Sequence, residues 1–221
     1  MDKKDRINQF KKAGIAQKSA LISSLIGQCD VLDVGCLGQD FNYYSKDWLH
    51  ARWKENAALL VGVDVNEIEL DKFNELKLNY MIVTPAELTE LNLVFDRIIM
   101  SDVIEHVGNV GEFLMFYKKF LKPEGRIIIT TPNPFSIKQF FNILLFKEPS
   151  YHPEHTCYID PINMLETAGR SDLEVIDFKW LHFYSAPSKL YQKALNHICK
   201  TLYRLLRYYS PNYLVILKSS R

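Results

Sequence analysis

The segment at residues 31–38, Val-Leu-Asp-Val-Gly-Cys-Leu-Gly, constrains the fold of this chain more than any other. Its apolar run is typical of a buried strand, and Gly35 lets the backbone turn tightly and approach a ligand closely. A second apolar strand pattern, at residues 59–64, ends in the carboxylate of Asp64. An acid at such a strand end can bind the two hydroxyls of a ribose. Together the two segments predict that a nucleoside-containing cofactor lies across the strand ends.

Strand and helix patterns alternate along almost the whole chain, which favours an α/β fold. We expect a Rossmann-like, mostly parallel sheet with helices on both faces, in a single domain formed by residues 1–221. Strands are predicted at residues 29–34, 59–64, 80–84, 95–100, 126–131, 173–181 and 213–217. Helices are predicted at residues 4–26, 48–57, 67–78, 135–146, 161–168 and 188–208, and a further helix after the fourth strand ends near residue 121. The first of them forms the N-terminal region, residues 1–27. The helix at 188–208 lies in an insertion, residues 186–210, before the last strand.

Composition limits the classes of partner and the compartment. The formal net charge is +1 and charged residues make up 24% of the chain, so broad nucleic-acid binding is not favoured. The cysteines (Cys29, Cys36, Cys157 and Cys199) are widely spaced, as in a protein with reduced thiols. Neither a secretory signal nor an apolar run long enough to span a membrane is evident. These features predict a cytoplasmic protein.

Further motifs follow the glycine turn in a fixed order. They are Phe-Asp-Arg-Ile-Ile at 95–99, Asp-Val-Ile-Glu-His at 102–106, Leu-Lys-Pro-Glu-Gly-Arg at 121–126 and Thr-Pro-Asn at 131–133. With the glycine turn and Asp64, this ordered set resembles the class I S-adenosylmethionine-dependent methyltransferases over residues 28–180. It is also similar to O-methyltransferases of the ubiquinone pathway. The resemblance implies S-adenosylmethionine as cofactor and a seven-stranded sheet whose last strand is antiparallel, between strands five and six.

The resemblance also implies a set of site residues. The first motif would surround the methionine part of the cofactor, Asp64 would bind the ribose, and Asp102 would lie near the sulfonium and the acceptor. Adenine would depend on the backbone of the two residues after Pro85, because that proline stands where an adenine-binding acid is common. The implied cofactor-binding residues are Asp33, Gly35, Cys36, Gly38, Asp64, Ala86, Glu87 and Asp102.

The first motif departs from the family pattern in ways that favour an alternative. Leu37 and Gln39 stand where the pattern has glycines, and Asp64 lies farther from Asp33 than the ~20 residues of the standard unit. The extra length, at residues 40–57, is rich in aromatic residues that either cover the sheet edge or stack on a base or sugar. A catalytically silent protein that binds the cofactor or a partner is therefore a second hypothesis.

Acidic and histidine side chains after the fourth predicted strand suggest how a hydroxyl would be activated. Asp102, Glu105 and His106 converge on one side of a helical turn, and His152 or His155 can close over them. In one interpretation His106, or else His155, is a general base beside Asp102, and no metal takes part. In another, Asp102, Glu105, His106 and His155 bind a divalent cation, as in metal-using 2′-O-methyltransferases of small RNAs. In a third, Glu105 only favours a helix start and His106 lines a pocket.

Two segments bear on the acceptor and on partners. The apolar helix at 135–146, within residues 135–160, either packs on the core or forms a lid over a partly apolar acceptor. The helix at 188–208 has a basic stripe that is either a solvated face or a peripheral membrane contact. We expect O-methylation of a small-molecule, glycan or lipid-linked acceptor. The enzyme alternative is metal-assisted RNA 2′-O-methylation.

Overall fold

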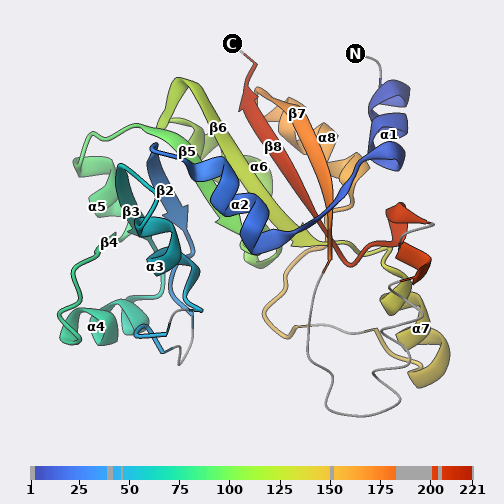
Figure 1. Cartoon of the computed structure of the whole chain (residues 1–221), viewed down its shortest axis with the longest axis horizontal. Helices are drawn as coiled ribbons and strands as arrows, with labels where there is room; N and C mark the ends of the chain where they lie inside the picture. Colours follow the sequence, from blue (N-terminus) through green and yellow to red (C-terminus); the bar gives the residue numbers. More distant parts are fainter. Residues whose placement is uncertain are drawn as a thin grey trace.

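The computed structural model describes residues 3–38, 42–45, 47–149, 152–182, 201–203 and 206–220. In this part of the chain, one sheet has the strand order β1-β7-β8-β6-β5-β2-β3-β4 (Figure 1). Strand β8 is antiparallel to both of its neighbours, β6 and β7, and all other pairs are parallel. The strands are β1 (Ile15–Gln17), β2 (Asp30–Val34), β3 (Leu59–Val63), β4 (Met81–Val83), β5 (Phe95–Ser101), β6 (Leu121–Pro132), β7 (Leu173–His182) and β8 (Asn212–Ser219). The mostly parallel α/β sheet and the antiparallel last strand are therefore confirmed.

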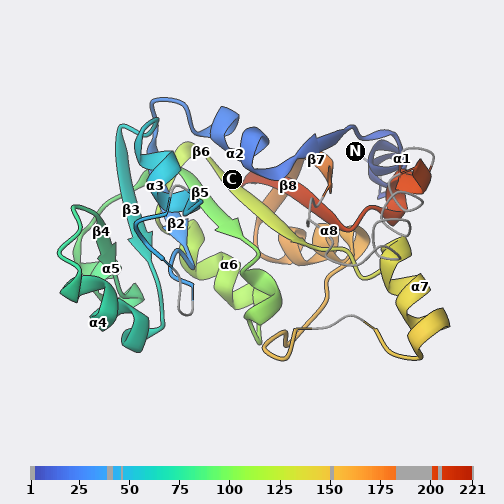
Figure 2. The ribbon, with the colours of Figure 1, turned by 60° about the horizontal axis from the view of Figure 1, so that its bottom comes forward.

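Helices cover both faces of this sheet (Figure 2). On one face, α2 and α3 pack through Ile22, Ile26 and Trp53 against apolar residues of the strands. On the other face, α6 and α8 contribute Leu114 and Met164 to the larger core. The helices are α1 (Lys3–Lys12), α2 (Lys18–Ile26), α3 (Leu49–Lys54), α4 (Glu67–Glu75), α5 (Pro85–Glu90), α6 (Val110–Lys118), α7 (Ile137–Phe146) and α8 (Pro161–Arg170), with short 3₁₀ helices η1 (Ile104–His106) and η2 (Arg207–Tyr209).

The N-terminal region differs from the prediction, because it is not one helix. Helix α1 ends at Lys12, and residues 15–17 form β1, which pairs in parallel with the edge of β7 before α2 begins. The Trp180 backbone N–H donates to the Gly14 carbonyl (3.0 Å), and its indole N–H donates to the Phe10 carbonyl (2.8 Å). Glycine is unfavourable inside a helix, and the β7 edge supplies the backbone partners that a helix would otherwise provide. This pairing adds an eighth strand to the seven predicted.

Two other elements depart from the predictions. Helix α5 was not predicted, yet its start is well specified: Pro85 opens it, and Thr84 and Glu87 form a capping box. Strand β6 begins at Leu121, five residues before the strand predicted at 126–131, and a register shift against β5 absorbs the extra residues. The predicted helix at 188–208, within 186–210, falls largely outside the described residues. The single-domain assignment stays a prediction.

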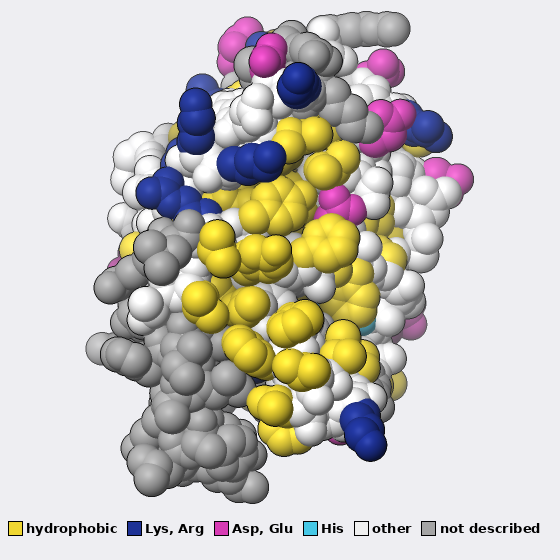
Figure 3. All heavy atoms as spheres, turned by 90° about the vertical axis from the view of Figure 1, so that its right-hand side faces the viewer, with side chains coloured by type: hydrophobic (Ala, Val, Ile, Leu, Met, Phe, Trp, Pro, Cys, Tyr) yellow, Lys and Arg dark blue, Asp and Glu magenta, His cyan; other side chains and the backbone are white. Residues whose placement is uncertain are grey.

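Helix α7 is an exposed apolar element. Ser136 caps it, its side chain accepting the Gln139 N–H, and none of the residues of α7 is buried. The exposed fractions of Phe140 and Leu144 are 57% and 62%, and Figure 3 shows a broad apolar surface on this side of the molecule. Packing on the core therefore does not explain its apolar residues, whereas the lid at 135–160 stays a prediction. None of the described helices has the length and apolar character needed to cross a bilayer.

Candidate functional site

The glycine turn after β2 needs a glycine at its first position. Gly35 has a φ of +70°, and a Cβ placed there would lie 2.7 Å from Cγ2 of Val103. Its N–H donates to the Val63 carbonyl at the end of β3, with a distance of 2.8 Å. Both the positive φ and the close approach exclude a larger residue. The turn thus has the geometry that the sequence predicts for a cofactor loop.

Asp64, directly after β3, holds this loop in place. Its side chain is 7% exposed; Oδ2 accepts the Leu37 N–H at 2.9 Å, and Oδ1 accepts the Asn66 N–H at 3.0 Å. A carboxylate offers about four lone-pair sites, so each oxygen retains acceptor capacity for a ribose hydroxyl. Asp64 therefore links the two segments expected to bind the cofactor.

Aromatic residues of the inserted stretch, residues 40–57, hold the glycine turn in place through hydrogen bonds to its backbone carbonyls. The Trp48 indole N–H donates to the Cys36 carbonyl (2.9 Å), and the Tyr43 hydroxyl donates to the Gly38 carbonyl (2.8 Å). Both aromatic side chains are buried and pack against Phe73 of α4. Of the two interpretations of this stretch, covering the sheet edge is the one observed for these two residues.

Asp33 and Cys36 are buried beneath the loop. Oδ2 of Asp33 lies 2.7 Å from Nδ1 of His50, and the two side chains are 5% and 1% exposed. Burial raises the pKa of Asp33, an effect that the His50 contact opposes. Burial likewise raises the pKa of the Cys36 thiol. Both residues support the loop from inside, and direct cofactor contact by either stays a prediction.

The residues expected on the adenine side form the first turn of α5. The Glu87 N–H donates to Oγ1 of Thr84 (3.2 Å), and the Glu87 carboxylate accepts the Thr84 N–H (2.7 Å). These cap bonds lower the pKa of Glu87. The backbone N–H of Glu87 is thus already engaged, whereas Ala86 beside it is exposed. Adenine contacts by Ala86 and Glu87 stay a prediction.

Asp102 marks the acceptor side of the site. It follows β5 with a φ of +56°, and its Oδ1 accepts the Thr130 hydroxyl of β6 at 2.9 Å. Its Oδ2 forms an ion pair with Lys18, the first residue of α2. Sequence reasoning missed Lys18, because only the pairing of β1 with β7 carries it to the end of β5. The ion pair fixes the Asp102 carboxylate beside the predicted position of the sulfonium.

Glu105 lies beneath the same region and anchors the next loop. Its side chain is 2% exposed and accepts the Thr131 hydroxyl at 3.0 Å. Burial, and then the nearby Asp102 charge, raise the pKa of Glu105 to about 7. Its carbonyl accepts the backbone N–H groups of Thr156 (2.8 Å) and Cys157 (3.2 Å). The histidine-containing loop at residues 152–160 therefore folds back over η1.

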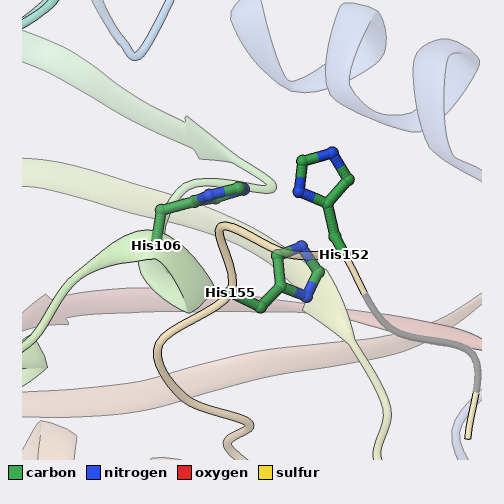
Figure 4. Close-up of side chains that lie close together, drawn as sticks. All are labelled: His106, His152 and His155. Atoms are coloured by element: carbon green, nitrogen blue, oxygen red, sulfur yellow. The ribbon is translucent and has the colours of Figure 1, made fainter.

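Three histidines converge at this point (Figure 4). The ring centroids of His106 and His155 are 4.8 Å apart, and His152 lies 5.8 Å from His106 and 5.3 Å from His155. One ligand nitrogen from each ring lies within 4.8 Å of the others, and Asp102 and Glu105 are not part of this group. Burial and the neighbouring imidazoles lower the pKa of His155. The fold thus brings His106 together with both His152 and His155, the two alternatives named from the sequence, whereas Asp102 and Glu105 lie outside this group.

This arrangement suits group transfer from a nucleoside cofactor. The turn and Asp64 offer a cradle for the cofactor at the carboxyl ends of β2 and β3, the usual ligand-binding edge of such sheets. Asp102 and the imidazoles lie at the end of the neighbouring strand β5. A neutral imidazole there can accept a proton from an acceptor group.

Comparison with known proteins agrees with this architecture. The sequence model of a family described as "Methyltransferase domain" matches residues 4–178. A ubiquinone biosynthesis O-methyltransferase of Rickettsia typhi is 29% identical over 192 residues, which cover 80% of this chain and 73% of the relative.

Solved structures share the fold. An S-adenosylmethionine-dependent methyltransferase from Archaeoglobus fulgidus matches with a TM-score of 0.59 and 20% identity, covering 91% of this chain and 94% of its own. A magnesium protoporphyrin IX methyltransferase from Synechocystis PCC 6803, with bound S-adenosylhomocysteine, matches with a TM-score of 0.57 and 12% identity, covering 92% and 82%. Because the family match spans most of the sequence, the chain belongs to the methyltransferase domain family and is a class I enzyme that uses S-adenosylmethionine.

Proposed function

We propose that the enzyme methylates a hydroxyl oxygen of a small lipophilic acceptor. The observation that carries this proposal is the pair of imidazoles, His106 and His155, beside Asp102 at the end of β5. A hydroxyl must lose its proton to become a good nucleophile, and a neutral imidazole is suited to accept it. The relatives named as ubiquinone biosynthesis O-methyltransferases support oxygen as the acceptor atom.

The cofactor supplies an electrophilic methyl group on a sulfonium. In the proposed complex the loop from Gly35 to Gly38 surrounds its methionine part, and Asp64 accepts the ribose hydroxyls. Asp102 lies near the positive sulfur, where a carboxylate is electrostatically favourable. These side chains mainly orient the donor, because an in-line displacement depends on positioning.

The imidazoles act on the acceptor. His106 is the first candidate for the base: it lies on η1, shortly after Asp102 in the sequence, and its side chain is exposed. His155 is the second candidate, since its lowered pKa keeps the ring neutral near pH 7. The hydroxyl oxygen forms a bond to the methyl carbon, the carbon–sulfur bond breaks with its electron pair left on sulfur, and the hydroxyl proton passes to the imidazole.

The exposed face of α7 supports an acceptor with an apolar portion. This helix begins five residues after the end of β6, the strand next to β5. Its exposed apolar residues are Phe140, Ile143, Leu144, Leu145 and Phe146. A lipid-linked glycan meets the same requirement through its lipid part, and the predicted membrane contact at 188–208 would suit either acceptor. We place the enzyme in the cytoplasm, in keeping with the free thiols of Cys29, Cys36 and Cys157.

The acceptor class can be tested by methyl transfer from labelled S-adenosylmethionine. The acceptors are a prenylated catechol, a lipid-linked glycan and a short single-stranded RNA, each assayed with and without a chelator. We expect the catechol to be methylated most efficiently. Transfer mainly to the RNA, abolished by the chelator, would overturn the proposal in favour of metal-assisted RNA 2′-O-methylation.

A matched pair of variants tests the role of the imidazoles. His106→Ala should lower kcat by about 10²–10⁴-fold, with cofactor affinity unchanged, because general-base catalysis is typically worth that much. His182→Ala, at the end of β7, is the control and should retain the wild-type kcat and cofactor affinity. Full activity in both His106→Ala and His155→Ala would remove the base from the proposal.

A further inference from the structure

The three-histidine cluster has a ligand set that the general-base mechanism does not require. We propose that His106, His152 and His155 bind one divalent cation of the borderline class, such as Zn²⁺, and leave a coordination position for an acceptor oxygen. The cation site stands on the geometry of the cluster alone. Its role toward an acceptor hydroxyl rests on the proposed function.

The donor atoms indicate the class of metal. All three side chains offer imidazole nitrogen, which suits zinc and neighbouring transition metals better than magnesium or calcium. Two carboxylates expected near the histidines are engaged elsewhere, since Asp102 pairs with Lys18 and Thr130, and Glu105 accepts the Thr131 hydroxyl. The site is therefore a nitrogen site, unlike the four-ligand set of carboxylates and histidines that is one of the interpretations of the sequence.

To bind a tetrahedral zinc ion, the three ligand nitrogens need to move only slightly closer together. Tetrahedral zinc with Zn–N distances near 2.0–2.1 Å places its nitrogens about 3.3 Å apart. Here the ligand atoms lie within 4.8 Å of one another, and the side chains of His106 and His152 are exposed, so rotation of their rings can close the difference. His155 gives the site a fixed point, because the adjacent Thr156 and Cys157 are bonded to the Glu105 carbonyl.

Two further observations point to a ligand. Nδ1 of His155 is buried and has no hydrogen-bond partner in the described part of the chain, which is costly unless something binds it. The Glu154 backbone N–H donates to Nδ1 of His152 (3.4 Å), which leaves Nε2 of that ring for a cation, and the Glu154 carboxylate, 4.0 Å from Nδ1, helps to balance the charge of the ion. Both features are explained by a bound metal ion.

Three protein ligands with an open fourth position are the arrangement of catalytic zinc sites. A cation held there would lower the pKa of a bound acceptor hydroxyl, which would then lose its proton to solvent water. The general-base role of His106 or His155 therefore applies to the metal-free enzyme, whereas in the loaded enzyme the imidazoles would serve as ligands.

Metal titration of the whole protein tests the site directly. Chelator-treated, reduced protein is titrated with Zn²⁺ by calorimetry and with Co²⁺ by visible absorption. We expect one ion per chain and a Co²⁺ spectrum typical of tetrahedral nitrogen ligation. His152→Ala and His155→Ala should each weaken Zn²⁺ binding by about 100-fold or more, because loss of a direct ligand costs more than the about 10–100-fold lost with an outer-shell partner.

Two control variants separate this site from other histidine and thiol ligands. His182→Ala should bind Zn²⁺ like the wild type, and so should Cys36→Ser, which alters the buried group of Asp33, Cys36 and His50. No binding by the wild type, or unchanged binding by both His152→Ala and His155→Ala, would overturn the proposal.

The same proteins are titrated with S-adenosylmethionine, and His152→Ala should retain wild-type cofactor affinity. Methylation of a hydroxyl acceptor without any Zn²⁺ binding would refute the metal site alone. Stoichiometric Zn²⁺ binding without methyl transfer to any hydroxyl acceptor would refute the proposed function and leave the metal site standing.

Discussion

Asp64 accepts the backbone N–H of Leu37 at a distance of 2.9 Å, which ties the end of β3 to the loop after β2. Leu37 occupies a position where the family pattern has glycine. A second bond, from the Asn66 N–H, fixes the other carboxylate oxygen. Asp64 therefore orders an irregular loop, and the remaining acceptor capacity of its carboxylate is what we propose serves the cofactor ribose.

Asp64→Ala should release the loop. Loss of a hydrogen bond to a charged acceptor is worth about 1.5–3 kcal/mol, so the Leu37 amide should exchange with solvent at least about tenfold faster. Asp64→Asn retains one acceptor oxygen and should show a smaller increase. Hydrogen exchange followed by NMR measures this, with Asp71→Ala, at an exposed position of α4, as the control. Unchanged protection of Leu37 in Asp64→Ala would show that the bond does not order the loop.

Gly35→Ala should destabilise the protein through two separable effects. The positive φ costs about 1–2 kcal/mol, and the added Cβ meets Cγ2 of Val103 at 2.7 Å. Val103→Ala in the same chain relieves the contact but leaves the backbone strain. Urea unfolding of the two single variants and the double variant should therefore give a favourable coupling of about 1–3 kcal/mol. A coupling near zero would mean that Val103 does not limit this turn.

His50→Ala should be among the more damaging single substitutions. It leaves the buried Asp33 carboxyl without its side-chain partner, and an unsatisfied buried polar group costs about 1–3 kcal/mol. Adding Asp33→Asn removes the stranded carboxyl, so the double variant should be more stable than the sum of the two single losses predicts. Strict additivity in denaturant unfolding would contradict this pairing.

The ion pairs between Lys122 and the carboxylates of Asp30 and Asp96 predict a specific acid dependence. The Lys122 contact and the Asp30 N–H lower the pKa of Asp96 below its ordinary value of 3.8. The folded state thus favours the ionised form, and this stabilisation is present above about pH 3.8 and lost as the pH falls through the lowered pKa. Asp96→Asn should therefore be less stable than the wild type at pH 6, and the difference should shrink near pH 3. Urea unfolding at both pH values measures this difference in unfolding free energy. A difference that grows on acidification would contradict the lowered pKa of Asp96.

Much of the fold was predictable because its signals are local. The apolar runs of β2, β3 and β5, and the glycine turn after β2, each lie within a few neighbouring residues. The replacement of the long N-terminal helix by β1 was not predictable in this way, since it depends on the exposed edge of β7, far away in the sequence. Lys18 reaches Asp102 only as a consequence of that pairing.

The candidate site was also predictable only in part, because contacts between distant segments of the chain determine its geometry. The sequence predicted Asp64, Asp102, His106 and His155 as site residues, but not how their side chains are held. The bonds from Thr156 and Cys157 to the Glu105 carbonyl decide which histidines meet, and backbone bonds of this kind leave no mark in the sequence. They bring His152 into the cluster in place of the carboxylates.

The most direct test of the account is calorimetric titration of the purified wild type and of Asp64→Ala with S-adenosylmethionine and S-adenosylhomocysteine. We predict that the wild type binds both at a single site with micromolar affinity, and that Asp64→Ala binds at least about tenfold more weakly, which corresponds to about 1.4 kcal/mol. Equal binding by both proteins would show that the cofactor site lies elsewhere. An absence of wild-type binding to either compound would contradict the account and favour a catalytically silent member of the fold.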